Sequence, residues 1–220
     1  MSTHSEKDRS KVKRLPERAL YDRDTIDEIV DTALICHVGF IDDGQPLVIP
    51  TIHVRVGEKI YLHGSPASRM LRTLARGAEA CITVTHVDGL VLARSAFHHS
   101  MNYRSAVLFG RGSAVADDGQ KLEALRALSE RLIRGRWADV RPPSEEELHK
   151  TLVVAIAIDE ASAKVRTGPP LDDEEDYALD VWAGVLPLQL TASAPIADPR
   201  LAAGIAAPQY ATGYVGPRPL

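Results

Sequence analysis

The chain has 220 residues, of which 45% are hydrophobic and 25% charged, and its formal net charge is −4. This composition is ordinary for a globular protein and excludes a disordered, collagen-like or coiled-coil chain. The mild acidity and the 5% aromatic content argue against nucleic acid or an anionic membrane as the main partner.

The N-terminal stretch is polar and has no apolar core of the kind found in a signal peptide. No apolar run reaches the roughly 18 residues that a bilayer span requires. Cys36 and Cys81 lie within apolar runs, which is typical of reduced structural thiols. We therefore expect a cytoplasmic protein in which residues 1–14 form a flexible tail.

The next part of the chain predicts a helix followed by a meander of three strands. Thr25 and Glu28 have the spacing of a capping box. Apolar residues then recur on one helical face as far as Ala33. Apolar and β-branched runs separated by glycine-containing turns predict strands at 34–41, 46–56 and 59–63.

A second helix is predicted from Ser65, which suits the N-cap, with Pro66 in the first helical position. Gly77 suits the position just after the end of this helix. Asp88-Gly89 has the chemistry of a hairpin turn. We therefore expect strands at 80–87 and 90–97 on either side of it, and a further strand at 103–115.

The last third of the chain predicts a long amphipathic helix between Asp117 and Gly135. Ser144 and Glu147 form a second capping-box pattern. Residues 152–158 read as a buried strand that runs on towards residue 165. From residue 168 the composition changes to an acidic run at 172–176 and then to Pro and Ala. We expect residues 168–220 to form an extended arm that packs on the main domain, residues 15–167, or on a dimer partner.

Seven strands at short spacing, several joined by tight turns, predict a mainly β (α+β) fold with an antiparallel sheet closed into a barrel. Helices lie between some strands without strict alternation, so a doubly wound parallel sheet is disfavoured. The chain has no glycine-rich dinucleotide fingerprint after a strand and no Gly-x-Ser-x-Gly elbow.

The first candidate site is the predicted strand-to-helix junction around residues 61–69. A helix N-terminus presents free N–H groups, which suit a phosphate. Ser65 and Ser68 add hydroxyl donors, Arg69 adds a guanidinium fork, and Gly64 permits close approach of a ligand. The competing interpretation is ordinary N-capping by Ser65 beside a solvated Arg69.

The second candidate is the polar segment from His98 to Ser105. Arg104 offers another phosphate contact, and Ser105 or Asn102 can bond the edge of a heterocycle. Neighbouring histidines on a strand point in opposite directions, and no zinc-ligand spacing is present, so we expect no metal. The competing interpretation is a polar strand end. No residue is required as an acid or base, and His63 and His98 are hypotheses for that role.

Three segments, in this order, carry a resemblance to a known family. They are Tyr61-Leu62-His63-Gly64-Ser65 with Ser68-Arg69, the run from Tyr103 to Gly112, and the tail from Gly168-Pro169-Pro170 to Leu188. The chain resembles the pyridoxamine 5′-phosphate oxidase-like FMN-binding split barrels, most of all the nitroimidazole-reductase-related flavoproteins. The resemblance implies an antiparallel split β-barrel with flanking helices. It also implies a homodimer with two FMN sites at the subunit interface.

The resemblance also implies roles for particular residues. The phosphate is expected at Ser65, Ser68 and Arg69, and His63 and Gly64 are expected among the other residues that bind the cofactor. The isoalloxazine is expected along Pro50, Thr51, Ile52 and His53, with Arg104 and Ser105 approaching from the later strands. Many family members have Lys where this chain has Met70, which removes one positive charge. The chain also lacks the C-terminal Arg- and Trp-containing motif of true pyridoxamine phosphate oxidases, so vitamin B6 synthesis is disfavoured.

The function implied is an FMN-dependent oxidoreductase that passes electrons from a reduced nicotinamide to a small acceptor such as a nitro compound or a quinone. One alternative is a flavin carrier or sensor without turnover. Another is a haem-binding or deazaflavin-binding split barrel. A purely structural protein is the last alternative, because the paired polar segments would then have no role.

Overall fold

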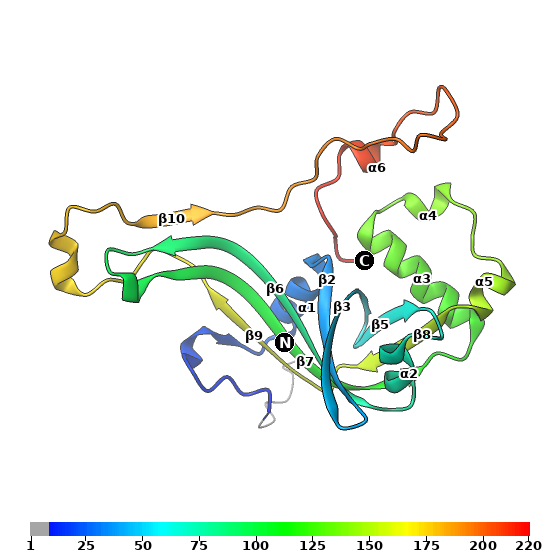
Figure 1. Cartoon of the computed structure of the whole chain (residues 1–220), viewed down its shortest axis with the longest axis horizontal. Coiled ribbons are helices and arrows are strands. Elements are labelled where there is room, and N and C mark those ends of the chain that lie inside the picture. The colour runs from blue at the N-terminus through cyan, green and yellow to red at the C-terminus, as the bar shows by residue number, and fades with distance from the viewer. Residues whose placement is uncertain (1–8) are drawn as a thin grey trace.

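A ten-stranded antiparallel sheet curls around the centre of the molecule in the computed structural model, which describes residues 9–220 (Figure 1). The main path of the sheet follows the order β3-β2-β6-β7-β8-β5-β4. Its strands are β2 (Ile35–Asp42), β3 (Gln45–Ile52), β4 (Val54–Val56), β5 (Lys59–Gly64), β6 (Glu79–Leu92), β7 (Ser100–Ala114) and β8 (Leu152–Ala157). The predicted antiparallel split barrel with flanking helices is confirmed.

Strand β7 joins the two halves of the barrel. Its residues Tyr103–Phe109 pair with β9 (Glu160–Arg166), whereas Gly112–Ala114 pair with β8. The short strand β1 (Ala19–Leu20) extends the sheet beyond β9, and β10 (Gly184–Pro187) pairs with β6.

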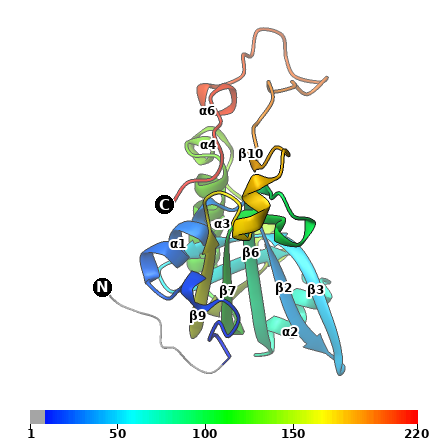
Figure 2. The same ribbon diagram turned by 90° about the vertical axis from the view of Figure 1, so that its left-hand side faces the viewer.

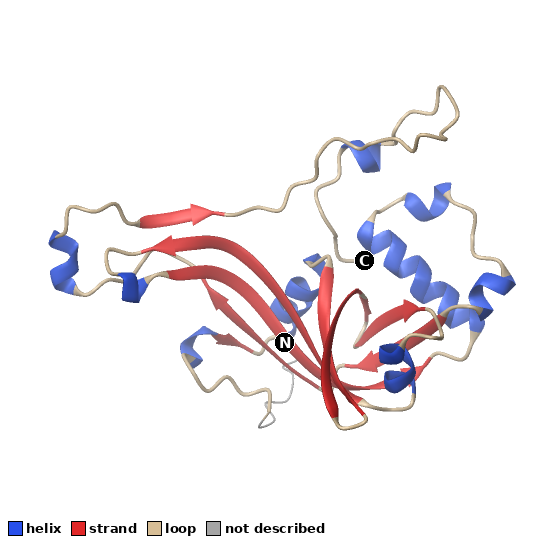
Figure 3. Cartoon of the chain, in the orientation of Figure 1, coloured by secondary structure: helices blue, strands red, loops and turns tan. Residues whose placement is uncertain are grey.

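Six α-helices and three 3-10 helices surround this sheet in the described residues (Figure 3). The α-helices are α1 (Arg23–Thr32), α2 (Arg69–Ala75), α3 (Asp118–Leu132), α4 (Arg136–Asp139), α5 (Glu145–His149) and α6 (Gln209–Thr212). The 3-10 helices are η1 (Pro16–Arg18), η2 (Ala96–His98) and η3 (Glu174–Ala178). No helix in the part of the chain that the structure describes is long and apolar enough to cross a bilayer.

The main core lies between the curled sheet and the helices α1 and α2. Its buried side chains include Ile26, Ile29, Leu62, Leu71 and Leu108. Cys36 lies in the same core, where burial raises the pKa of its thiol to about 12. A thiol this weakly acidic stays protonated at neutral pH and is not a nucleophile.

The helix caps differ from two of the sequence predictions. Asp22, and not Thr25, caps α1, because its carboxylate accepts a hydrogen bond from the backbone N–H of Thr25. Helix α2 begins later than predicted, with Ser68 as its N-cap in place of Ser65. The capping box of Ser144 and Glu147 at the start of α5 is confirmed.

Two strand predictions were wrong in their connections. The predicted strand at 46–56 is interrupted at His53, which separates β3 from β4. The predicted hairpin at Asp88-Gly89 is a β-bulge inside the single long strand β6. The strand predicted to run on from 158 towards 165 does continue along β7 in the same direction, as β9, after a short break at 158–159.

Two glycines of the segment 103–112 are required by close packing. A Cβ on Gly110 would lie 1.8 Å from the carbonyl oxygen of Ala157, and a Cβ on Gly112 would lie 2.4 Å from that of Leu74. These contacts let β7 pass directly against β8 and α2. Part of the segment that carries the family resemblance therefore serves the barrel itself.

The β6–β7 hairpin extends beyond the barrel, and the first part of the arm, as far as β10, runs along it before the chain leaves towards α6 (Figures 1 and 2). Strand β10 of the arm pairs with the outer part of β6, from Gly89 to Leu92. Near its start the arm is fixed by Arg166, which donates to the carbonyl oxygens of Gly168 and Pro169. Asn102 of β7 also donates to the Gly168 carbonyl.

The predicted tail of residues 1–14 falls only partly within the structure, since residues 1–8 lie outside the described residues. Within the described part, the Arg9 guanidinium donates to the carboxylate of Glu160 at 2.7 Å. Lys164 donates to the carbonyl oxygen of Arg14.

Candidate functional site

The first candidate site is the turn that leads from β5 into α2. Its backbone is closed by a hydrogen bond from the Ser68 N–H to the Ser65 carbonyl oxygen. The Ser65 hydroxyl oxygen accepts from the N–H of Ala67, and the Ser68 hydroxyl oxygen accepts from that of Leu71. Because both oxygens act as acceptors here, each O–H remains a donor for an anion. We call residues 63–69 the β5–α2 junction.

Arg69 provides the positive charge of the junction. Its side chain is exposed, and among the described residues it forms no hydrogen bond or ion pair. The adjacent Met70 is buried in the main core. Position 70 therefore faces away from the exposed side of the junction, and the absence of a lysine there takes no charge from that surface.

His63 is half-buried at the end of β5, where its backbone pairs with Val153. Its Nδ1 atom is buried and has no hydrogen-bond partner among the described residues. Burial lowers the pKa of the imidazole, so the ring is neutral at physiological pH. The His63 ring lines a small gap with Leu125 and Leu128 of α3, whereas Gly64 faces Leu71 of α2, so the His63 side chain lies on the other face of β5 from α2.

The predicted isoalloxazine strand is β3, which pairs with β2 and, among the described residues, has no strand on its other edge. Pro50 is exposed on this strand, and Thr51 and Ile52 are half-buried. Strand β4 pairs with β5 through Val54 and Tyr61, so the end of β3 lies at the same end of the barrel as the junction.

The His53 imidazole points into the core instead of towards this surface. It is fully buried, and its Nε2 lies 3.0 Å from the carbonyl oxygen of Val30. Burial lowers its pKa to about 3, so it is neutral. Its own carbonyl oxygen accepts from the buried guanidinium of Arg131. The His53 side chain is thus bonded within the protein, and only its backbone lies near the β3 edge.

Arg104 and Ser105 lie far from the junction within one chain. Arg104 forms a two-pronged ion pair with Asp88, with both N···O distances at 3.0 Å. This pairing raises the pKa of Arg104. The Ser105 hydroxyl donates to the carbonyl oxygen of Lys164. Gly112, which packs on α2, is about eight residues further along β7, or roughly 25 Å at the usual strand rise. The structure therefore brings Pro50–His53 to the junction but leaves Arg104 and Ser105 apart from it.

A cavity of about 380 Å³ lies between α3 and the C-terminal segment. The residues that line it include Arg131, Arg134, Arg218, Tyr210 and Tyr214. Sequence reasoning missed this feature, because the tail has no periodic pattern that would dock it on the helix. The concentration of guanidinium groups suits an anionic group, and within residues 9–220 no histidine, cysteine or methionine lines the cavity.

Comparisons with known proteins bear on both the fold and the site. A family model described as pyridoxamine 5′-phosphate oxidase matches residues 22–165. Among curated proteins, none matches the sequence.

Three solved structures illustrate the similarity. The flavocytochrome Anf3 from Azotobacter vinelandii is 42% identical, with a TM-score of 0.88, covering 94% of this chain and 96% of that one. An FAD- and haem-binding protein from Mycobacterium smegmatis is 41% identical, with a TM-score of 0.86, covering 91% and 98% respectively. A proposed 5-nitroimidazole antibiotic resistance protein from Bacteroides thetaiotaomicron is 26% identical, with a TM-score of 0.56, covering 67% and 86%. The first two similarities include most of the C-terminal arm, because they span more than nine-tenths of the chain.

Proposed function

This chain belongs to the pyridoxamine 5′-phosphate oxidase family, and from that premise we propose that it is a flavin-binding oxidoreductase. The observation that carries the proposal is its identity of 41–42% to a flavocytochrome and to an FAD- and haem-binding protein. In the proposed reaction, electrons pass from a reduced nicotinamide through the flavin to a small acceptor. A bound flavin supplies the hydride and single-electron chemistry, and the protein supplies binding and orientation.

The β5–α2 junction fits the phosphate of a flavin nucleotide. The exposed Arg69 guanidinium would pair with the phosphate, and the hydroxyls of Ser65 and Ser68 would donate to it. The small Gly64 lies at the same turn and permits close approach to the backbone. The open edge of β3 at Pro50 and Thr51 would accommodate the ring system.

The form of the flavin is either FMN or FAD. The resemblance of the sequence favours FMN, whereas the Mycobacterium smegmatis protein is described as binding FAD. Both nucleotides carry the same isoalloxazine ring and a phosphate on the same ribityl chain, so the junction suits both. A comparison of how much FMN and how much FAD the protein retains after desalting distinguishes the two.

We further propose that the protein acts as a homodimer with the flavin at the subunit interface. The β6–β7 hairpin and the arm expose large apolar side chains, among them Phe97 at 88%, Trp182 at 67% and Leu186 at 51%. An exposed apolar surface of this kind marks an interaction site. A second copy would cover it, and would bring its own Arg104 and Ser105 towards the junction of the first.

Haem binding is a second candidate function. It is supported by the two full-length similarities, since one of those proteins is described as a flavocytochrome and the other as haem-binding. The described residues that line the 380 Å³ cavity include no histidine, cysteine or methionine, so they offer a haem no axial ligand of those types there. A Soret band in the purified protein supports this function. A non-catalytic flavin carrier is supported instead if flavin binds but neither NADH nor NADPH reduces it.

The phosphate assignment is tested by the variant Arg69→Ala. Loss of a charge-assisted hydrogen bond costs roughly 1.5–3 kcal/mol, which corresponds to about ten- to a hundredfold weaker flavin binding. Arg72→Ala is the matched control, because Arg72 is an exposed arginine on the next turn of the same helix. A fluorescence titration with FMN and with FAD measures the affinity. Equal affinity of the two variants would show that the phosphate lies elsewhere.

A further inference from the structure

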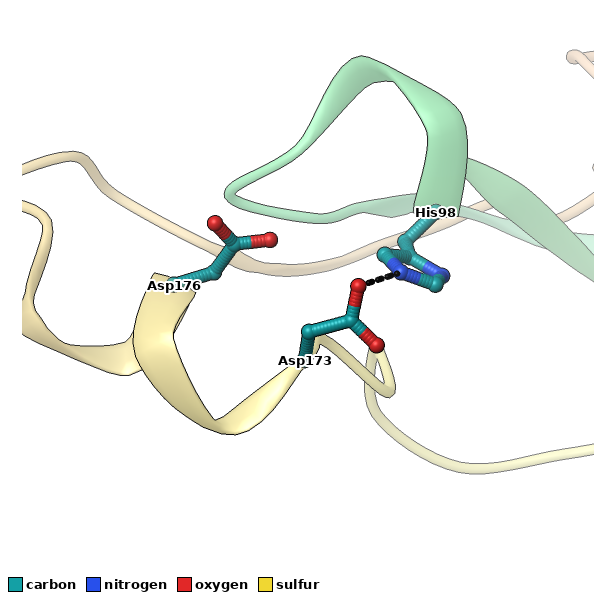
Figure 4. A group of neighbouring side chains, drawn as sticks. All are labelled: His98, Asp173 and Asp176. Carbon is teal, nitrogen blue, oxygen red and sulfur yellow. Dashed lines mark hydrogen bonds and ion pairs between the residues drawn. The ribbon is translucent and has the colours of Figure 1, made fainter.

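A cluster of metal-ligand side chains lies where the arm crosses the end of the β6–β7 hairpin. His98 comes from η2 in the hairpin, whereas Asp173 and Asp176 come from the start of the arm. One ligand atom from each of the three residues lies within 4.8 Å of the others. Figure 4 shows the imidazole of His98 turned towards the two carboxylates. His98 and Asp173 are 75 residues apart in the chain, so no local spacing in the sequence reveals the cluster.

The backbone on both sides of this cluster is fixed by other contacts. Asp172 precedes the cluster, and its carboxylate accepts hydrogen bonds from the backbone N–H groups of Arg94 and Ser95. The guanidinium of Arg94 bonds the same carboxylate at 3.2 Å and lies over the ring of Tyr177. The arm and the hairpin are therefore held together independently of His98.

The imidazole ring is also oriented. Its Nε2 lies 3.2 Å from the Oδ2 atom of Asp173. The Phe97 ring meets the imidazole edge-on, with the ring centroids 5.2 Å apart. His98 is only partly exposed, with 23% of its side chain accessible. Little reorganisation is needed for this nitrogen and the two carboxylates to meet one ion.

The charge around the cluster favours a cation. Residues 172–176 are acidic throughout. Among the described residues, the basic side chains that contact this run are Arg94 on Asp172 and His98 on Asp173, and no ion pair involves Glu174, Glu175 or Asp176. A divalent cation would neutralise this excess negative charge without adding a further basic side chain.

We propose that His98, Asp173 and Asp176 form a divalent metal site that takes Zn²⁺ or a similar transition-metal ion and clamps the arm to the hairpin. One imidazole nitrogen and two carboxylate oxygens are a ligand set that zinc accepts, with a solvent molecule as a further ligand. The imidazole disfavours Mg²⁺ and Ca²⁺, which prefer oxygen ligands only. The ion binds the unprotonated nitrogen of the neutral imidazole, and a ring that is doubly protonated loses one proton to solvent as the ion binds.

The site is tested by Zn²⁺ titration of the full chain, with any affinity tag removed and bound metal stripped with a chelator. Isothermal calorimetry is expected to give one strong site per chain. His98→Ala and Asp176→Asn are each expected to weaken Zn²⁺ binding by about tenfold or more. His99→Ala and Glu175→Gln are the matched controls, because both are exposed neighbours of the cluster and neither belongs to it. The controls are expected to retain the wild-type affinity.

A second experiment measures whether the bound metal holds the arm against the hairpin. Limited proteolysis is expected to cut near residues 168–178 more slowly with Zn²⁺ than without it in the wild-type chain, and equally fast in His98→Ala. Thermal unfolding of each variant shows that the barrel itself is intact. The proposal is overturned if Zn²⁺ binds no more tightly to the wild type than to His98→Ala, or if Mg²⁺ binds as strongly as Zn²⁺.

Discussion

Arg131 is expected to be a principal determinant of stability, and the variant Arg131→Met tests this. It is the largest fully buried side chain among the described residues. Its guanidinium donates to the carbonyl oxygens of Val30, Asp31 and Ala33 at the end of α1, and to that of His53 between β3 and β4. The last carbonyls of a helix have no partner within the helix and attract a cation. Arg131 therefore caps α1 from a distant part of the chain.

The size of the expected loss of unfolding free energy follows from these contacts. Each of the four charge-assisted hydrogen bonds contributes roughly 1.5–3 kcal/mol. Burial opposes them, since it lowers the pKa of Arg131 and desolvating such an ion costs several kcal/mol. Methionine fills much of the same volume but leaves four buried carbonyl oxygens without this donor. We expect the variant to lose about 3–5 kcal/mol of unfolding free energy.

Urea denaturation followed by circular dichroism measures this loss by linear extrapolation. Arg126→Met is the matched control, because Arg126 is an exposed arginine on the same helix. We expect the control to change the unfolding free energy by less than about 0.5 kcal/mol. Equal unfolding midpoints for the two variants would refute the capping role of Arg131.

Three further predictions concern packing, pH and the arm. Gly110→Ala places a methyl group 1.8 Å from a carbonyl oxygen of β8, so we expect a loss of more than about 3 kcal/mol or no folded protein. Gly39→Ala, where a Cβ would have its nearest neighbour at 3.3 Å, is expected to lose less unfolding free energy in the same urea denaturation. The reverse order of the two losses would contradict this packing. The pKa of His53 falls from 6.5 to about 3 on folding. Between these two pH values the unfolded chain binds more protons than the folded chain, so the unfolding free energy should fall by up to about 1.4 kcal/mol for each pH unit that the pH drops. Urea denaturation at several pH values should show a weaker dependence of the unfolding free energy on pH in His53→Gln. Asp172→Ala removes the acceptor of two backbone amides and a guanidinium on the hairpin, and should speed proteolysis of the arm at an unchanged barrel midpoint, unlike Glu175→Gln.

The local signals in the sequence predicted most of the elements. The β-branched runs of the barrel and the capping box at Ser144 need only neighbouring residues to act, so a short window is enough to find them. Gly77 is another such signal. It follows α2 with a φ of +92°, a conformation that glycine adopts without strain.

The errors arose where a distant segment determined the local structure. Asp88-Gly89 has the chemistry of a turn, yet in the fold Asp88 pairs with Arg104. A Cβ on Gly89 would lie 3.0 Å from the carbonyl oxygen of Leu186, so glycine is needed there for the arm to approach. The conformation at both residues is determined by contacts with residues far away in the sequence, and a short window of sequence does not reveal such contacts.

The candidate site also has some features that neighbouring residues determine and others that a distant segment determines. Ser65, Ser68 and Arg69 are close in sequence, and their grouping at one turn was predictable. The inward orientation of His53 depends on Arg131, which is 78 residues away. One signal pointed to Arg131, since it continues the buried face of α3 that includes Ala124 and Leu128. A charged residue on an apolar helix face indicates a buried partner.

The most direct test of flavin binding is the visible absorption spectrum of the purified full chain, recorded after incubation with FMN or FAD and removal of unbound flavin. The proposed function predicts that the bands of oxidised flavin are retained by the wild type and reduced in Arg69→Ala, while Arg72→Ala behaves like the wild type. Loss of both flavins from the wild type on desalting, with a well-folded circular dichroism spectrum, would contradict it.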